Sequence, residues 1–419
     1  MTTPRFRILL AICLAYMLFA VLLNSVGTVI LQSIASLGQT KTSASVLEAF
    51  KDLPIAITSF LVASLLPRFG LKNALALACA LVGIACIAMP LVPAFATAKL
   101  LFAITGASFA LVKVSCFALL GLVSRDARDH ASLMNILEGL FMVGVLSGYL
   151  VFSAFIDSAD PAGLGWVQVY WPLAIVSFAI CALVITTPID ESAARPAAFD
   201  TRRDMLAMFT LCARPLVLIF LVSAFLYVLI EQAIGTWLPT FNNEVLGMPQ
   251  AMSVLATSLF ALSTAVGRLG AGLVLRFVGW FTLLATCIAA MTLLIVLTLP
   301  LTTGLEPRPD MTWGTAPLAA FLLPTIGLFL APIYPIINSR ILSALPAPTH
   351  APMTGLIVVF SALGGTTGSF ITGQVFAAMG GQSAFYAALL PMALLLLALV
   401  VFRRMDAGVR VESNRKAPQ

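Results

Sequence analysis

Long runs of hydrophobic residues constrain this chain more than any other feature. About twelve such runs, each of roughly twenty residues, follow one another along the 419-residue sequence. A helix needs about twenty apolar residues to cross a bilayer core of about 30 Å. The pattern therefore predicts an all-α integral membrane protein with twelve transmembrane helices.

Composition supports the membrane class and excludes others. Hydrophobic residues make up 61% of the chain and charged residues 10%, whereas a soluble domain has about 45–50% and about 25%. The net charge of +6 is not gathered in a basic tract or stripe, so nucleic acid is not an expected partner. With no Cys/His/Asp cluster in the sequence, we expect neither a metal site nor a cofactor.

The hydropathy pattern divides the chain into two halves of six spans. We expect an N-terminal half over 1–187, a cytoplasmic central loop over 188–212, a C-terminal half over 213–402 and a cytoplasmic tail over 403–419. The expected spans are 8–31, 44–66, 73–92, 96–123, 133–156, 168–187, 213–238, 250–275, 281–301, 315–342, 352–378 and 383–402.

The distribution of basic residues predicts the orientation of the chain. If both termini are cytoplasmic, 17 of the 23 Lys and Arg residues fall in cytoplasmic segments. Only Lys41, Lys99 and Arg308 fall outside, and three more lie within spans. Because cytoplasmic loops are enriched in Lys and Arg, we expect a bacterial inner-membrane protein with both termini in the cytoplasm.

The two halves share landmarks at nearly constant spacing, which indicates an internal repeat. The matching positions are Arg7 and Arg214, Asn24 and Glu231, Arg-Phe-Gly at 68–70 and Arg-Phe-Val-Gly at 276–279, and Pro90 and Pro300. Each pair is about 207–210 residues apart. Parallel repeats of six helices build one large class of transporters, in which alternating access is rocking of the repeats about a central site.

This organisation resembles the major facilitator superfamily. The loop LLPRFGLKNAL at 65–75 is similar to the superfamily's Gly-…-Asp-Arg-x-Gly-Arg signature, with Arg68, Gly70 and Lys72 matching and Pro67 at the position of the Asp. The stretch GRLGAGLVLRFVG at 267–279 resembles the matching signature of the second half. The resemblance implies conformational gating by Arg68, Gly70, Arg268 and Arg276.

A narrower resemblance is to the fucose–proton symporter branch and its relatives of unassigned substrate. It rests on FLYVLIEQAIGTWLPTF at 225–241 and on APIYPIINSRI at 331–341. The sugar-site acid expected in the first span of that branch is absent, since Asn24 and Ser25 stand there.

Seven ionisable residues fall within the expected spans. They are Glu48, Lys51, Asp52, Lys113, Glu138, Glu231 and Arg268. A charge at the bilayer centre costs roughly 2.5–3.5 kcal/mol on insertion scales, so intramembrane charges usually mark a transport pathway. A secondary transporter is therefore the class that the sequence favours.

Glu48, Lys51 and Asp52 are three and four residues apart, so they share one face of a helix. Two readings remain open for them. Asp52 is a substrate or proton ligand whose pKa is tuned by Lys51, with Glu48 as a further proton site. Alternatively, Glu48 and Lys51 form an ion pair that only fixes packing.

Lys113 lies near the middle of its span and needs an acid or an anionic ligand, because it cannot easily reach the membrane surface. Its partner is Glu138, Asp52 or a substrate carboxylate, and the alternative role is a permanent ion pair between helices. Glu231 is the first candidate for a proton-titrating site, followed by Glu138.

Uncharged residues complete the expected substrate site. The candidates are Asn24, Gln232, Trp237, Tyr334 and Asn338, in addition to Lys51, Asp52 and Lys113. Trp237 either stacks on a ligand or lies at the membrane interface. Pro332 and Pro335 interrupt the helix that carries Tyr334 and Asn338, which frees carbonyl groups.

The sequence thus predicts a proton-coupled secondary transporter, not an enzyme, for a small polar solute. Acids and bases within the spans favour an anionic or zwitterionic solute. The alternatives are an efflux carrier for a drug-like compound or a metallophore, and a proton–sugar symporter. Protons, the lipid bilayer and the solute are the expected partners, and the protein is expected to be a monomer.

Overall fold

The computed structural model describes residues 3–189, 191, 210–308, 310–346 and 349–416. These residues form α-helices, short 3-10 helices and connecting segments, without a strand among them. Of the predicted central loop, residues 190 and 192–209 lie outside the described residues. The chain divides into two compact units, which are described separately below.

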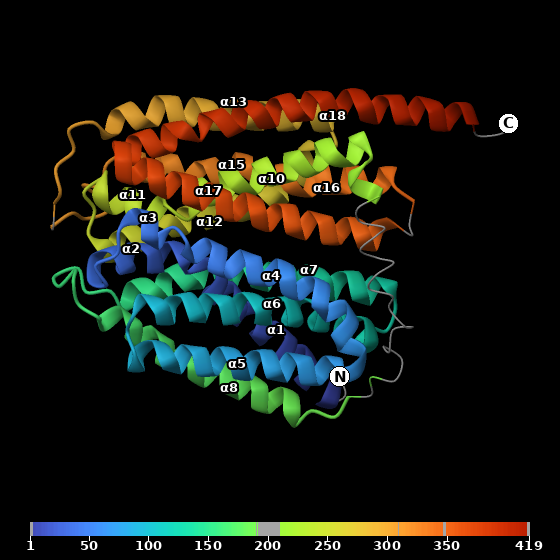
Figure 1. Ribbon diagram of the computed structural model, residues 1–419, viewed down its shortest axis with the longest axis horizontal. Coiled ribbons are helices and arrows are strands. Elements are labelled where there is room, and N and C mark those ends of the chain that lie inside the picture. Colours follow the sequence, from blue (N-terminus) through green and yellow to red (C-terminus); the bar gives the residue numbers. More distant parts are fainter. Residues whose placement is uncertain (1–2, 190, 192–209, 309, 347–348, 417–419) are drawn as a thin grey trace. The chain divides into compact units, whose positions relative to one another are not determined.

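Unit 1 comprises Met1–Asp200, Met248–Ser258 and Arg308–Met311. Its helices are α1 (Thr3–Asn24), α2 (Val26–Ser36), α3 (Lys41–Ala44), α4 (Leu47–Phe69), α5 (Leu71–Leu91), α6 (Phe95–Val123), α7 (Ala127–Ala154), the 3-10 helix η1 (Gly165–Val169) and α8 (Tyr170–Ile185). Helix α6 packs against α4 and α5, α5 packs against α8, and α1 packs against α7 (Figure 1).

Unit 2 comprises Thr201–Gly247, Leu259–Pro307 and Thr312–Gln419. Its helices are α10 (Pro215–Gly235), α11 (Leu238–Glu244), most of α12 (Gln250–Val274), α13 (Trp280–Thr298), η3 (Leu299–Thr302), α14 (Ala319–Leu322), η4 (Leu323–Thr325), α15 (Ile326–Leu330), α16 (Ile333–Ala344), α17 (His350–Ala387) and α18 (Leu389–Lys416). Helix α10 packs against α17, α18 and α16, and α13 packs against α15 and α18.

Glycine allows the closest helix contacts in both units. A Cβ atom on Gly364 or Gly368 of α17 would overlap the backbone carbonyl oxygens of Phe225 and Leu229 on α10. In unit 1, a Cβ atom on Gly144 of α7 would lie 2.7 Å from the carbonyl oxygen of Met17 on α1. Helices in membranes associate through such small-residue faces, because close backbone approach supplies van der Waals contact.

Most of the expected twelve spans correspond to long apolar helices. Ten described segments are long and apolar enough to cross a membrane, and one of them, Pro352–Met405, has 54 residues. That segment contains the kink at Gly380 and the end of α17, so it is long enough for two crossings. Helix α4 (Leu47–Phe69) has 23 residues, coincides with the expected span 44–66 and carries Glu48, Lys51 and Asp52 in its first turns.

Several spans are broken or longer than expected. The first span divides at Ser25 into α1 and α2, and the seventh divides after Gly235 into α10 and α11. The interruption predicted near Pro332 is present, since α15 ends at Leu330 and α16 begins at Ile333. The predicted tail at 403–419 is mostly helical, because α18 continues to Lys416.

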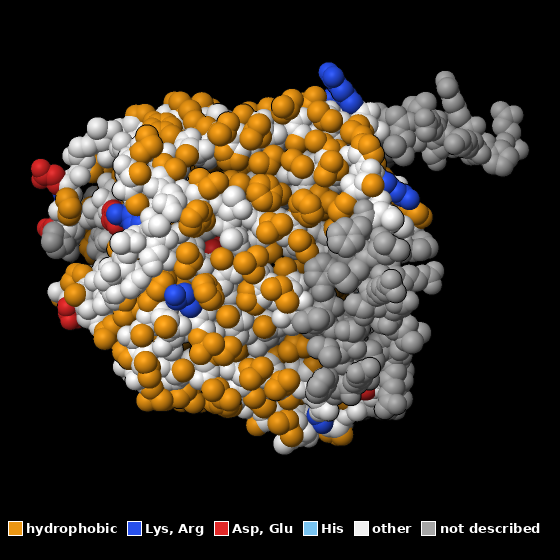
Figure 2. Space-filling model, viewed as in Figure 1, with side chains coloured by type: hydrophobic (Ala, Val, Ile, Leu, Met, Phe, Trp, Pro, Cys, Tyr) orange, Lys and Arg blue, Asp and Glu red, His pale blue; other side chains and the backbone are white. Residues whose placement is uncertain are grey.

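Exposed apolar side chains cover the helices, as a lipid-facing surface requires. Ile175 of α8 is 69% exposed and Leu269 of α12 is 79% exposed. Hydrophobic side chains also dominate the visible middle portions of the helices, whereas charged side chains there are few (Figure 2). Exposed apolar surface of this extent needs an apolar solvent, so these faces are suited to a bilayer.

The glycine contacts of α17 give a stability prediction. We expect Gly368→Ala to lower the melting temperature in detergent, since the new methyl group overlaps the Leu229 carbonyl oxygen of α10. Overpacking of this kind costs about 1–3 kcal/mol. Gly121→Ala on α6 is the control, because no atom lies within 4 Å of the position that its added methyl group would take. Equal melting temperatures for the two variants would contradict the packing argument.

Candidate functional site

Lys113, Glu138 and Tyr16 form a polar cluster in unit 1. Lys113 lies on α6, and its side chain is exposed although it is about ten residues, roughly 15 Å, from the end of α6 at Val123. Glu138 of α7 is also exposed, and its Oε1 accepts a hydrogen bond of 3.3 Å from the hydroxyl of Tyr16 on α1. Lys113 interacts electrostatically with Glu138. The described residues contain no ion pair of Lys113 within 4.0 Å.

Aromatic rings surround this cluster. Tyr16 contacts Phe109 and Phe117 of α6 at ring-centroid distances of 6.0 and 6.1 Å, and Phe141 of α7 at 5.0 Å. Phe109 and Phe117 are four residues before and after Lys113, so the three side chains share one face of α6. The ammonium group therefore lies on the aromatic face that α6 turns toward α1 and α7.

Glu48, Lys51 and Asp52 are buried together at the start of α4. The Lys51 ammonium donates a short hydrogen bond to Glu48 and lies 3.4 Å from Oδ1 of Asp52. One cation thus contacts two carboxylates in a buried position. Removing one partner of a buried ion pair typically costs about 3–5 kcal/mol in stability, because the other charge is left buried and unpaired. The contacts of Lys51 therefore agree with the alternative in which Glu48 and Lys51 form an ion pair that fixes packing.

Unit 2 contains a second polar cluster on α10, α16 and α17. The Tyr227 hydroxyl donates a hydrogen bond of 3.1 Å to Oε1 of Glu231, and the Tyr227 ring stacks on Tyr334 at 5.1 Å. The hydroxyl groups of Tyr334 and Ser361 lie 3.0 Å apart. Oδ1 of Asn338 is buried without a hydrogen-bond partner among the described residues. Glu231, the first proton-site candidate from the sequence, therefore accepts a hydrogen bond from a tyrosine of its own helix.

Trp237, which the sequence predicts either to stack on a ligand or to lie at the membrane interface, is buried in the structure. Its side chain has 0% exposed area, its Nε1 donates to the carbonyl oxygen and hydroxyl of Ser369, and its ring contacts Phe376. The ring is thus packed against α17 and shielded from solvent.

Asn24 and Gln232 lie near the breaks in their spans. The amide of Asn24 donates to the carbonyl oxygen of Ala20 at 2.8 Å, one residue before the break at Ser25. The side chain of Gln232 accepts from the Thr236 hydroxyl at 3.4 Å, next to the break after Gly235.

The gating candidates of the second half are exposed. Arg268 and Arg276 both have exposed side chains, on α12 and just beyond its end. Arg268 interacts electrostatically with Tyr227, which places it within reach of the Glu231 cluster. Arg268 also borders a cavity between α12, α13 and α16.

Gly70 lies at the start of α5, where Glu191 binds the helix end. Gly70 has a φ of 78°, in the left-handed region that glycine adopts easily. The Glu191 carboxylate accepts hydrogen bonds of 2.7 Å from the backbone N–H groups of both Leu71 and Lys72. A carboxylate at a helix N-terminus satisfies unpaired N–H groups and favours the helix dipole. The side chain of Arg68 lies outside the described residues.

Sequence reasoning missed Tyr16, Tyr227, Ser361 and Glu191. The two tyrosines sit in apolar runs, and a tyrosine there is normally packing. Tyr227 is four residues before Glu231, which is a signal that the helical spacing could have supplied. Glu191 is more than 100 residues from the start of α5, which it binds, and local sequence patterns do not predict contacts over such a separation. Among the described residues, no three His, Cys, Asp or Glu side chains are placed to hold a metal ion.

The Glu191 contact gives a second prediction. We expect Glu191→Ala to lower the melting temperature, because losing a helix cap costs about 0.5–2 kcal/mol. Glu191→Gln keeps one acceptor oxygen but loses the charge, so it should lower the melting temperature less than Glu191→Ala does. The control is Glu306→Ala, which removes an exposed loop carboxylate. A Glu191→Ala variant as stable as this control would show that the cap contributes nothing.

The comparisons with known proteins agree on one family. The sequence profile of the Major Facilitator Superfamily matches residues 8–365. A comparison with curated protein sequences finds no match. The fold is similar to that of solved transporter structures, and the sequence identities of 14–16% to the three described next limit that likeness to the fold.

Three of these structures illustrate the likeness. The nucleoside transporter NupG has a TM-score of 0.71 and 16% identity, over 96% of this chain and 99% of that one. The D-xylose-proton symporter has a TM-score of 0.70 and 14% identity, over 95% and 97%. FucP in its outward conformation has a TM-score of 0.60 and 14% identity, over 96% and 99%.

Three findings agree: the family match over most of the chain, the ten described segments that are long and apolar enough to cross a membrane, and the shared fold. They indicate a multi-pass membrane transporter rather than an enzyme. The chain belongs to the Major Facilitator Superfamily.

Proposed function

We propose that this protein is a proton-coupled carrier for a small anionic or zwitterionic solute, working by alternating access in a bacterial inner membrane. Both termini are cytoplasmic in this proposal, and the protein works as a monomer. The proposed substrate contacts are those of Lys113 in unit 1 and of the Tyr334 and Asn338 cluster in unit 2. Glu231 and Glu138 are the proposed proton sites.

The environment of Lys113 is the observation that carries the proposal. A lysine deep in a span is costly unless an anion or water compensates its charge. Lys113 is exposed and interacts electrostatically with Glu138, yet none of its described neighbours forms a close ion pair with it. Lys51, in contrast, already contacts two carboxylates. Lys113 is therefore the cation with room for a carboxylate of the solute.

The aromatic rings beside Lys113 also favour a carboxylate that has an apolar body. The ammonium group shares the α6 face of Phe109 and Phe117, so a bound solute would meet apolar rings beside the cation. Binding sites for small molecules are mostly apolar with a few polar groups that fix orientation. This face suits a carboxylate with an apolar body better than a fully hydroxylated solute.

The tyrosine-bound glutamates support proton coupling. Glu138 accepts from Tyr16, and Glu231 accepts from Tyr227. A tyrosine hydroxyl can donate to a carboxylate and accept from a carboxylic acid. Each glutamate could therefore gain a proton and keep its partner, with donor and acceptor exchanged.

A neutral sugar is the second candidate substrate, and the unit 2 cluster favours it. Tyr227 and Tyr334 offer stacked rings, and Asn338 has a buried carbonyl oxygen without a described partner. Among similar folds, the D-xylose-proton symporter carries such a solute according to its name. The two candidates differ in the residue on which binding depends.

A thermal-shift screen tests the substrate class. We expect a carboxylate or amino acid to raise the melting temperature of the purified protein, since a ligand at a hundredfold excess over Kd stabilises by about 2.7 kcal/mol. The shift should vanish in Lys113→Ala. It should persist in Lys99→Ala, which removes a lysine stacked on Phe50 and Phe95 instead.

The contrary result of this screen is equally specific. A shift produced only by neutral sugars, kept in Lys113→Ala and lost in Asn338→Ala, would reject the anionic solute. It would also leave Lys113 as part of a structural pair with Glu138.

Proteoliposome transport tests the proton site. With a substrate from the screen, we expect Glu231→Gln to abolish accumulation driven by a pH gradient but to retain counterflow exchange. Exchange needs no net proton movement, whereas accumulation does. Glu244→Gln, at the end of α11, is the matched control and should accumulate normally. Normal accumulation by Glu231→Gln would remove Glu231 from the coupling step.

A further inference from the structure

A cavity of about 420 Å³ in unit 2 has no part in the proposed function. It lies between the last turns of α12, the start of α13, and α16. Its lining includes Arg340, Trp280, Ser339, Ile336, Leu275 and Ala271. No Asp or Glu belongs to the lining, so the cavity combines positive charge with apolar walls.

The cavity opens on a different face of α16 from the Tyr334 cluster. Tyr334 and Asn338 are four residues apart, and Tyr334 contacts Tyr227 of α10 and Ser361 of α17. Ile336 and Ser339 are rotated from Tyr334 and Asn338 by about 100–160° at 100° per residue, and they line the cavity toward α12 and α13. A ligand of the cavity is therefore distinct from a solute bound by Tyr334 and Asn338.

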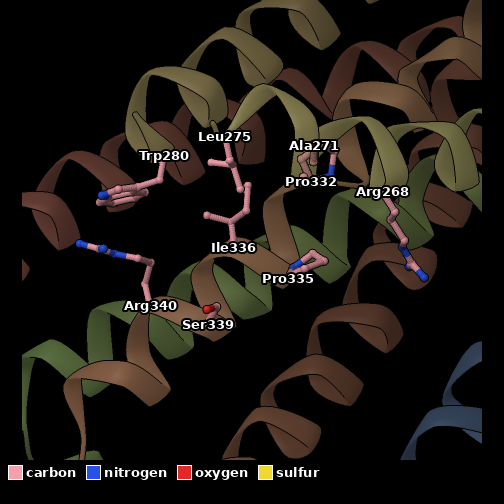
Figure 3. A pocket seen from close by; sticks show the side chains of 10 residues that line it. Arg268, Ala271, Leu275, Trp280, Pro332, Pro335, Ile336, Ser339 and Arg340 are labelled. Carbon is pink, nitrogen blue, oxygen red and sulfur yellow. The ribbon is translucent and has the colours of Figure 1, made fainter. Parts of the chain in front are cut away.

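The Trp280 ring positions the guanidinium group of Arg340 at the cavity. The Arg340 guanidinium lies over the Trp280 ring, 5.2 Å from its centroid, and the two side chains face each other in Figure 3. Trp280 in turn packs edge-on against Phe281 and Phe402, with Phe402 buried. Arg268 also lines the cavity, but its side chain points away from this pair (Figure 3), so Arg340 supplies the charge beside the Trp280 ring.

The position of the pair along the helices matches that of a lipid headgroup. Trp280 is the first residue of α13, and Arg340 is four residues before the end of α16 at Ala344. Helix ends with Trp and Arg occur at the membrane–water interface. There a guanidinium meets lipid phosphates, and basic pockets between transmembrane helices are known to bind anionic headgroups.

The apolar part of the cavity continues into the lipid-facing surface. Leu275 and Ile336 line the cavity. On the adjacent stripe of the same end of α12, Leu269 and Leu273 are 79% and 59% exposed, and Phe277 just beyond it is 87% exposed. An acyl chain that covers this stripe could therefore extend into the cavity without leaving an apolar environment.

We propose that this cavity binds one anionic phospholipid, with its phosphate on Arg340 and an acyl chain between α12, α13 and α16. Ser339, next to Arg340, offers a hydroxyl donor for the same headgroup. The guanidinium suits a phosphate because its N–H groups form a planar fork that can donate two hydrogen bonds.

Native mass spectrometry of the delipidated full-length protein tests the site. Phosphatidylglycerol is titrated into detergent solutions of the wild type, of Arg340→Ala and of Arg276→Ala. We expect the wild type and Arg276→Ala to retain one tightly bound phosphatidylglycerol, and Arg340→Ala to bind it at least fivefold more weakly. Arg276 is the control because it is an exposed arginine outside the cavity lining.

Two further titrations distinguish an anionic phospholipid from a neutral lipid and from free phosphate. Phosphatidylcholine should bind at least fivefold more weakly than phosphatidylglycerol, and excess inorganic phosphate should not displace the lipid. Equal binding by wild type and Arg340→Ala, or equal losses in the two arginine variants, would overturn the proposal. Displacement by inorganic phosphate alone would also overturn it, since it would indicate an ion site without a lipid.

A second variant keeps the proposal testable if Arg340→Ala does not fold. Ala271→Leu leaves Arg340 in place and fills part of the apolar cavity. We expect it to weaken phosphatidylglycerol binding at least threefold and to leave the melting temperature of the lipid-free protein within about 2 °C of the wild type. Unchanged lipid binding in Ala271→Leu would exclude the cavity as the acyl-chain site.

Discussion

The cost of removing a charge from water governs the polar part of this protein. An ion moved into a medium of low dielectric constant loses hydration worth several kcal/mol, and a partner must replace it. The chain meets this requirement in two ways. Lys51 is buried between two carboxylates, whereas the cation at Lys113 keeps an exposed side chain and a weaker electrostatic partner. In the proposed function, Lys51 is a charge fixed for packing and Lys113 is a charge available to a solute.

Close packing of the surrounding helices makes these positions specific. Gly364 and Gly368 bring α17 against the backbone of α10, the helix that carries Tyr227 and Glu231. Gly144 does the same for α7 and α1, which hold Glu138 and Tyr16. A tyrosine hydroxyl reaches a glutamate only if the helices are near enough, so the hydrogen bond in unit 1 depends on the packing of small residues elsewhere in the same helix pair.

The sequence predicted the spans and the position of the charges well, because both depend on local hydropathy. It predicted less of the contacts. The Lys51 pairs follow from helical spacing, but the Glu191 cap joins residues about 120 positions apart, and Pro67 at the usual acid position gave no hint of it. The burial of Trp237 was not predicted, because hydropathy gives depth along a span but not which face is buried. The breaks at Ser25 and after Gly235 were also hidden within continuous apolar runs.

A comparison of Lys51, Arg340 and Lys113 shows why charge alone does not identify a binding site. Lys51 has two acids in contact, so an incoming anion would have to displace a carboxylate and leave it buried, at a cost of several kcal/mol. Arg340 is positioned by an aromatic ring at a helix end, where no acid lines the cavity and an anion can approach from the membrane interface. Lys113 combines depth with an exposed side chain, and in the proposed function its partner is one that can enter and leave. A transported solute has that property, since a permanent ion pair would keep the charge satisfied in every conformation.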